Sequence, residues 1–178
     1  RCGLPGYHCC RFVPALKHSL SGLVFPCILS LVTDPVTGAK LTLHMTYLAE
    51  DGRAKAPVAR PRLFWPGLAV GTGVVRLSSD DEVEGGLFIS EGLEDGQSLL
   101  DYGMRPLWAC LSAGSMGNFP VLAGIGALTL CPDADTPGRK SAIKCRERWT
   151  SAGREVTVTF PRGSAKDFNE VAMSRAVA

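Results

Sequence analysis

The sequence predicts an α/β protein in which a mainly parallel sheet flanked by helices follows a small antiparallel β-rich module. Strand-like and helix-like segments alternate from Gly86 onward, which is typical of a parallel sheet covered on both faces. The first third of the chain carries strand-like segments separated by turn signals instead. With 178 residues, of which 46% are hydrophobic, the chain is long enough to bury a core. We expect the β-rich module in residues 1–84 and the α/β part in residues 85–178.

The elements expected in the first part are strands and turns. Residues 26–32 form an apolar strand, and the Pro and Gly of residues 34–38 suit a turn. Residues 40–48 alternate as a returning strand, in which His44 has no obvious catalytic partner and is interpreted as structural. A further short strand is expected at residues 74–77.

The second part is predicted to alternate between strands and helices. The expected strands are residues 87–89, 107–111, 127–131 and 156–160. The expected helices are residues 91–104, 118–123, 138–152 and 166–174. Apolar residues at helical spacing, such as Ala142, Cys145 and Trp149, indicate the buried side of the third helix.

Charge is distributed unevenly along the chain. The net charge of +2 gives no global indication of a nucleic-acid or membrane partner. Residues 79–101 nevertheless carry eight acids and no Lys or Arg, while residues 35–78 carry six bases against two acids and residues 138–154 six against one. An acidic segment between two basic ones fits a metal site beside a polyanion, although a solvated loop would explain part of it.

Five carboxylates follow the predicted strands of the second part. Glu91 comes after the first of these strands, Asp133 and Asp135 after the third, and Asp167 after the last, while Asp95 lies one helical turn beyond Glu91. Carboxyl ends of parallel strands share one edge of a sheet, where ligands gather. So many carboxylates stay ionised together only beside cations, and oxygen ligands suit Mg²⁺ or Mn²⁺. Taken singly, Glu91 suits a helix N-terminus, the Asp-x-Asp pair a turn, and Asp167 an N-cap.

Three motifs give the second part a family resemblance. Residues 89–95 (ISEGLED), 130–138 (LCPDADTPG) and 166–170 (KDFNE) resemble the Toprim domain, the metal-binding catalytic module shared by primases, topoisomerases and some nucleases. The match is closest to the primase-helicase-like proteins of phages, plasmids and mobile elements, in which Gly-Arg-Lys, here residues 138–140, opens the helix after the Asp-x-Asp. Upstream segments resemble the region that precedes Toprim in this group, namely residues 12–16, 46–48, 51–52 and 55–57.

The resemblance implies a role for each carboxylate. Glu91 would act as general acid/base or as a metal-linked carboxylate, and Asp133 and Asp135 would bind the divalent metal. Asp95 and Asp167 match further acids of the metal cluster. The implied activity is that of a DNA primase-like nucleotidyltransferase, in which metal-dependent phosphoryl transfer to a 3′-hydroxyl makes short primers, as part of a larger replication protein. A Toprim nuclease and a non-catalytic nucleic-acid-binding module of a primase-helicase are the alternatives.

The implied partners are single-stranded DNA, nucleoside triphosphates and, in addition, a helicase. Basic residues of both parts are candidates for binding the template backbone or the triphosphate: Lys55, Arg60, Arg62, Arg139, Lys140, Lys144 and Lys166. The basic residues that begin the 138–152 helix fit a solvated helix face equally well. No paired Cys-x-x-Cys motif and no Walker-type phosphate loop occurs in this sequence.

Localisation is expected to be cytoplasmic, without membrane association. No signal peptide is visible, and the most apolar stretch is interrupted by Pro26 and short for a spanning helix. The seven cysteines are odd in number and show no disulfide framework, as in proteins of a reducing compartment.

Overall fold

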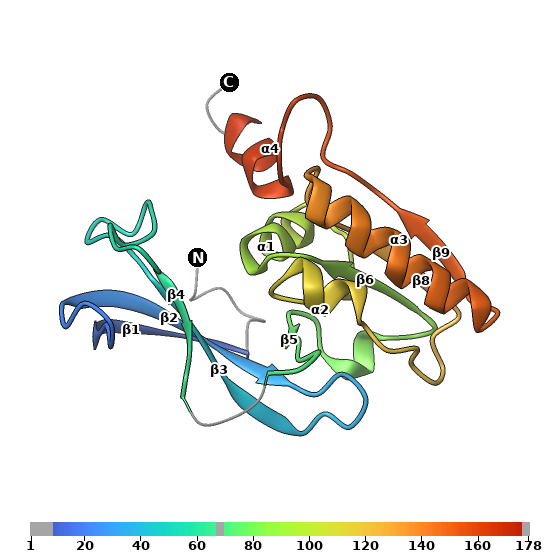
Figure 1. Cartoon of the computed structure of the whole chain (residues 1–178), viewed down its shortest axis with the longest axis horizontal. Coiled ribbons are helices and arrows are strands. Elements are labelled where there is room, and N and C mark those ends of the chain that lie inside the picture. The colour runs from blue at the N-terminus through green and yellow to red at the C-terminus, as the bar shows by residue number, and fades with distance from the viewer. Residues whose placement is uncertain (1–8, 67–69, 176–178) are drawn as a thin grey trace.

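Two β-sheets, one of four strands and one of five, organise the chain (Figure 1). The computed structural model describes residues 9–66 and 70–175. The prediction of an antiparallel β module followed by a mainly parallel sheet with helices is confirmed.

The first sheet is antiparallel throughout and has the strand order β1-β2-β3-β4. Its strands are β1 (Cys10–Lys17), β2 (Val24–Thr33), β3 (Lys40–Tyr47) and β4 (Arg62–Phe64). The turn between β2 and β3 forms because the Asp34 carboxylate accepts hydrogen bonds from the amides of Val36 and Thr37. Gly38 completes this turn at a φ of 72°, a conformation that favours glycine.

Strand β3 is covered on both faces. Met45 and Tyr47 pack with Cys27 into a small core on one face, as their alternation predicts. His44 and Thr46, which point the other way, are also buried. The second face of β3 therefore lies inside the molecule, on the side of the second sheet.

The second sheet has the order β5-β7-β6-β8-β9. Its strands are β5 (Val75–Arg76), β6 (Gly86–Ser90), β7 (Leu107–Ala109), β8 (Ala127–Cys131) and β9 (Glu155–Val158). Strands β6 to β9 are parallel, and β5 pairs antiparallel with β7 at one edge. Strand β5 thus joins the second sheet, although the chain reaches it before residue 85. The boundary at residues 84 and 85 stays a prediction.

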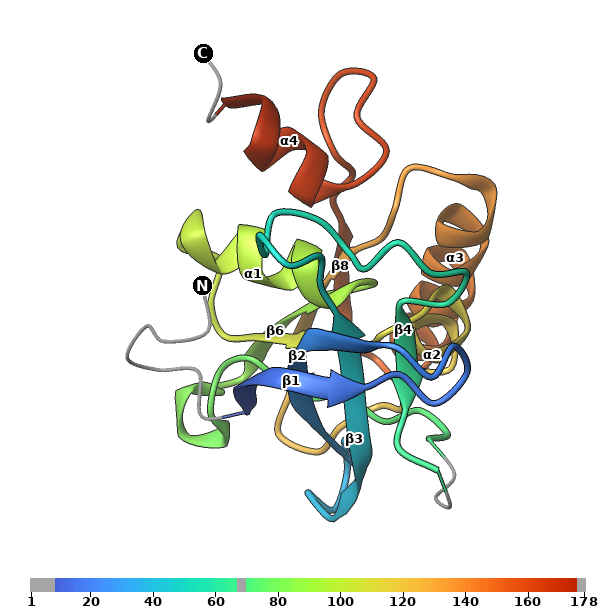
Figure 2. The same cartoon turned by 90° about the vertical axis from the view of Figure 1, so that its left-hand side faces the viewer.

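Helices cover both faces of the second sheet. They are α1 (Leu93–Asp101), α2 (Ala113–Gly117), α3 (Thr136–Ser151) and α4 (Phe168–Arg175), with a short 3₁₀ helix at Asp80–Glu82. Trp108 packs with α3 on one face, whereas its neighbours Leu107 and Ala109 pack with α1 on the other. Figure 2 shows α1 and α3 on opposite sides of the sheet. This burial on both faces explains the nearly continuous apolar runs of the strands.

One predicted helix is misplaced. Residues 118–123 are not helical, and helix α2 lies before them at Ala113–Gly117. Helix α2 begins there because the Ser112 hydroxyl accepts a hydrogen bond from the Ser115 amide, which caps the first turn. Helix α3 similarly begins at Thr136, two residues earlier than predicted, because Asp135 caps it. Within the described residues, none of the helices combines the length and apolar character of a membrane span.

Candidate active site

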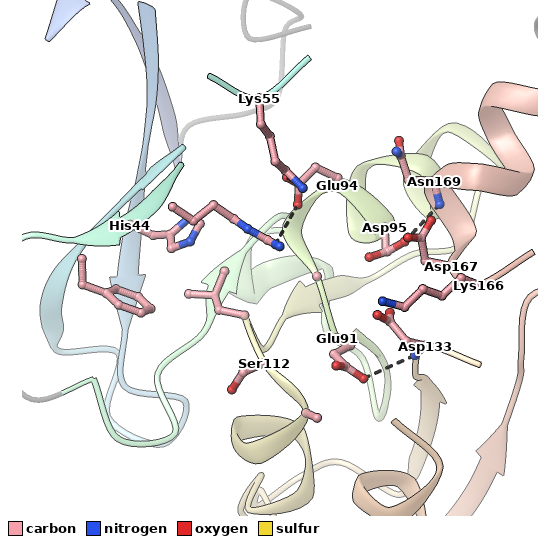
Figure 3. Close-up of a pocket in the computed structure, with 15 residues that line it drawn as sticks. His44, Lys55, Glu91, Glu94, Asp95, Ser112, Asp133, Lys166, Asp167 and Asn169 are labelled. Carbon is pink, nitrogen blue, oxygen red and sulfur yellow. Dashed lines mark hydrogen bonds and ion pairs between the residues drawn. The ribbon is translucent and has the colours of Figure 1, made fainter. Parts of the chain in front are cut away.

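A cavity of about 490 Å³ lies between the two sheets, at the carboxyl ends of β6 and β8 (Figure 3). The first part of the chain contributes His44, Lys55, Arg62 and Phe64 to its lining. The second part contributes Glu91, Gly92, Glu94, Asp95, Leu111, Ser112, Ala113, Asp133, Lys166, Asp167 and Asn169. Four of the five predicted carboxylates, Glu91, Asp95, Asp133 and Asp167, therefore line one cavity.

Glu91 and Asp133 are held together by the ends of neighbouring strands. Glu91 follows β6, and its Oε2 accepts a hydrogen bond from the backbone amide of Asp133, 3.3 Å away, which follows β8. A side chain at residue 138 would collide with the Asp133 carbonyl and press on Glu91 Oε2. Gly138 therefore permits the close approach of the Glu91 carboxylate and the Asp133 backbone to the start of α3.

Asp95 and Asp167 are tied to the first turn of α4. Asp95 Oδ1 accepts a hydrogen bond from the Asn169 amide at 3.0 Å, and Asp167 Oδ1 accepts one from the Glu170 amide at 2.7 Å. Asp167 thus caps α4, as the structural alternative predicted, and also lines the cavity. The Ala134 amide donates to the Lys166 carbonyl at 2.7 Å, which joins the loop after β8 to the loop before α4.

The carboxylates of the cavity repel one another. Burial, followed by the charges of Asp167 and Asp133, raises the pKa of Asp95 to about 6. Burial and the charge of Glu91 raise the pKa of Asp133 to about 6. Burial also raises the pKa of Glu91, and the negative charges of Asp135 and Asp95 raise it further. The positive charge of Lys166 opposes these shifts for Glu91 and Asp133, but it does not cancel them.

The donor chemistry of the cavity fits a hard divalent cation. Carboxylate oxygens are the ligands that Mg²⁺ and Mn²⁺ prefer, and a bound cation would relieve the repulsion among them. In the described ranges, however, no three His, Cys, Asp or Glu side chains are gathered closely enough to hold a metal ion as they stand. The metal and its ligand set therefore stay predictions.

Asp135 occupies a different position from the other predicted ligands. Its Oδ1 accepts a hydrogen bond from the Gly138 amide at 2.9 Å and caps α3. Its Oδ2 lies 3.6 Å from Lys166 Nζ. Asp135 is not among the residues that line the cavity, yet its charge raises the pKa values of Glu91 and Asp133.

Two cations of the first part line the cavity and form ion pairs with Glu94 of α1. Lys55 Nζ lies 3.1 Å from Glu94 Oε1, and an Arg62 guanidinium nitrogen lies 3.7 Å from Glu94 Oε2. Burial favours the neutral form of Glu94, but Lys55 and Arg62 together hold its pKa below the ordinary value. This contact between α1 and the first part fixes two of the predicted phosphate-binding residues beside the carboxylates.

The remaining predicted cations lie outside the cavity lining. Arg60 and Lys140 are exposed. Lys144 Nζ donates to Asn118 Oδ1 at 2.7 Å, and the Arg139 guanidinium lies 4.5 Å from the centre of the Phe160 ring. Of the predicted cations, only Lys55, Arg62 and Lys166 line the cavity.

Several residues of the cavity were not predicted, and three of them carry side chains that matter for its chemistry. His44, Phe64 and Glu94 line it without having been candidates. The available signal for His44 was the polar face that it shares with Thr42 and Thr46 on a strand whose other face is apolar. Glu94 could be found only by placing the first part against α1.

Comparisons with known proteins agree with this geometry. A family model described as the Toprim domain matches residues 86–178, and a model of a domain of unknown function, DUF7146, matches residues 1–77. A search among curated proteins found no significant match.

Solved structures of primases share the fold. A DNA primase domain from Pseudomonas aeruginosa matches with a TM-score of 0.57 at 17% identity, over 90% of this chain and 52% of that one. The DnaG primase catalytic domain bound to single-stranded DNA gives a TM-score of 0.57 at 17% identity, over 90% and 54%. The primase fragment of the bacteriophage T7 primase-helicase protein matches with a TM-score of 0.55 at 15% identity. The match covers 85% of this chain and 59% of that fragment. The chain spans about half the length of these primase structures.

Proposed function

Because this chain belongs to the Toprim domain family, we propose that it is a primase-like nucleotidyltransferase, which makes short primers on a single-stranded DNA template. The observation that carries the proposal is the composition of the cavity. Carboxylates at the ends of parallel strands face Lys55 and Arg62 of the antiparallel module across one space. Such a space can hold a reacting phosphate between metal-binding and phosphate-binding groups.

The carboxylates would hold Mg²⁺ or Mn²⁺, with Glu91, Asp95, Asp133 and Asp167 as the candidate ligands and Asp135 beside them. When bound, the cation supplies stabilisation of the negative charge that develops during phosphoryl transfer. Glu91 is half-buried with a raised pKa, which makes it a better acceptor for the proton of an attacking hydroxyl. Lys166, Lys55 and Arg62 would orient the phosphates.

The partners follow from the same proposal. We expect single-stranded DNA and nucleoside triphosphates as substrates, because one of the matched primase domains is described as bound to single-stranded DNA. The matched T7 fragment comes from a primase-helicase, so a helicase is the proposed partner in a larger cytoplasmic replication protein of a phage, plasmid or mobile element. Arg60, Arg139, Lys140 and Lys144 would contact the template outside the cavity.

The test is primer synthesis on single-stranded DNA with labelled nucleotides and Mg²⁺ or Mn²⁺. Short metal-dependent products are expected, and Glu91→Gln and Asp133→Asn should each reduce them by roughly a hundredfold or more. Glu155→Gln, at an exposed carboxylate of β9, is the matched control and should retain full activity. Shortened DNA in place of products would indicate a nuclease. Intact DNA with binding retained would indicate a non-catalytic module.

A further inference from the structure

The wall of the cavity opposite the carboxylates is aromatic. His44 of β3 and Phe64 of β4 are register partners in the first sheet. Their ring centres lie 5.1 Å apart and their planes meet at 61°. His44 is only 4% exposed, whereas Phe64 is 39% exposed and offers its surface to the cavity. Figure 3 shows His44 across the cavity from Glu91 and Asp133.

His44 carries a buried polar atom that nothing in the described residues satisfies. Its Nδ1 has no hydrogen-bond partner, although the ring lines the cavity. Leaving such an atom unpaired costs free energy, and buried polar groups without a partner are rare in folded proteins. Because the ring lines the cavity, a small rotation of the ring would let a ligand in the cavity supply the missing partner.

The chemistry of His44 does not suit a phosphate. Burial lowers the pKa of His44 to about 4, with Arg62 and Lys55 adding to this effect and Glu94 opposing it. The ring is therefore neutral near pH 7 and presents one donor and one acceptor. Phosphate groups are better matched by the two cations beside it, Lys55 and Arg62. A neutral ring nitrogen that can donate or accept, next to an exposed aromatic ring, matches the edge and face of a heterocyclic base.

We propose that His44 and Phe64 form a nucleobase-binding subsite, in which Phe64 stacks on the base and His44 hydrogen-bonds to its edge. This inference rests on the proposed function in that its ligand is a nucleotide. Stacking on aromatic side chains is a general way of holding single-stranded nucleic acid bases. The base belongs either to the template strand or to the incoming nucleotide, and the two arms of the experiment separate these sources.

The first arm compares an oligonucleotide with an abasic one of the same length and charge, by fluorescence anisotropy. The unchanged protein should prefer the base-bearing strand. Phe64→Leu should reduce this preference by about tenfold, and His44→Phe by roughly fivefold, without weakening abasic binding. His44→Asn keeps a polar atom near the position of Nδ1 and should restore part of the preference.

The second arm compares a nucleoside triphosphate with inorganic triphosphate in the presence of Mg²⁺, by calorimetry. If the subsite holds the incoming nucleotide, the same two variants weaken binding of the nucleoside triphosphate alone. Phe12→Leu, at an exposed phenylalanine of β1, is the matched control and should change neither comparison. Equal circular-dichroism spectra and unfolding midpoints establish that the variants are folded.

The inference is overturned if, in both arms, the unchanged protein binds the base-bearing and the base-free ligand equally well. It is also overturned if His44→Phe and Phe64→Leu weaken binding of both kinds of ligand equally. A preference seen in the first arm alone assigns the subsite to the template, and one seen in the second alone assigns it to the nucleotide. Both arms measure binding, so they are independent of primer synthesis. Base discrimination without primers would refute only the proposed function, and primers without base discrimination only this subsite.

Discussion

Neutralising Asp95 should stabilise the metal-free protein at neutral pH. Asp95 is 7% exposed, and its Oδ1 accepts the Asn169 amide hydrogen bond. Asparagine in the same place retains an oxygen that accepts this bond, but it removes a charge that burial disfavours and that Asp167 and Asp133 repel. The variant Asp95→Asn therefore removes the cost of holding a buried charge beside other carboxylates.

The size and sign of the effect follow from the pKa of Asp95. The rise from 3.8 to about 6 means that the folded protein binds this proton more tightly than the unfolded chain does. Stability consequently falls as pH rises from about 4 through about 6, and stays lower above that range. At roughly 1.4 kcal/mol per pKa unit, Asp95→Asn should gain about 2–3 kcal/mol at pH 7.5 and only about 0.5 kcal/mol at pH 4.

Urea unfolding in EDTA at pH 4 and pH 7.5 measures the difference. Asp51→Asn, in an exposed turn, is the control and should leave the free energy of unfolding within about 0.5 kcal/mol at both pH values. Added Mg²⁺ should stabilise the unchanged protein more than Asp95→Asn, because the variant has one carboxylate fewer for the cation. A variant no more stable than the unchanged protein at pH 7.5, or a gain that is larger at pH 4, would refute the argument that this buried charge costs stability.

Three further variants test the contacts that position the cavity. Trp149→Ala should cost about 3–5 kcal/mol in urea unfolding, because the fully buried indole stacks on Phe119 with ring centres 6.0 Å apart. Asp135→Ala should lose about 1 kcal/mol in thermal unfolding through removal of the α3 cap, and Asp135→Ser should recover most of it; equal losses in both would contradict the capping role. Glu94→Gln should cost about 0.5–1 kcal/mol in low salt, and less in 1 M NaCl, because its pair with Lys55 is partly exposed; a loss that does not depend on salt would exclude the ion pair as its cause.

Much of the fold could be predicted because its signals are local. The strand at Ala127–Cys131 has the predicted bounds, since an apolar run ends there at Pro132. Helix α2 was placed five residues too late, because its sequence contains two glycines and gives a weak helical signal. The cap at Ser112 is a local cue that outweighed this weakness in the folded chain.

The cavity was predictable on one side only. Glu91, Asp133 and Asp167 could be placed together because parallel strands bring their carboxyl ends to one edge. His44 and Glu94 could not, since their surroundings depend on how the first sheet lies against the second. That arrangement depends on contacts between residues far apart in the sequence, such as the pair of Glu94 with Lys55.

Strand β5 covers one strand edge that would otherwise be open. Val75 and Arg76 cover the outer edge of β7 by pairing with Ala109 and Trp108. A protein that began at residue 85 would leave these backbone groups of β7 unpaired, as an open edge that can add a strand from another molecule. Loss of Val75 and Leu77, both buried, would also expose apolar surface beside that edge. Residues 74–78 therefore protect this edge of the sheet from pairing with another molecule. The α/β half should aggregate when it is expressed without them.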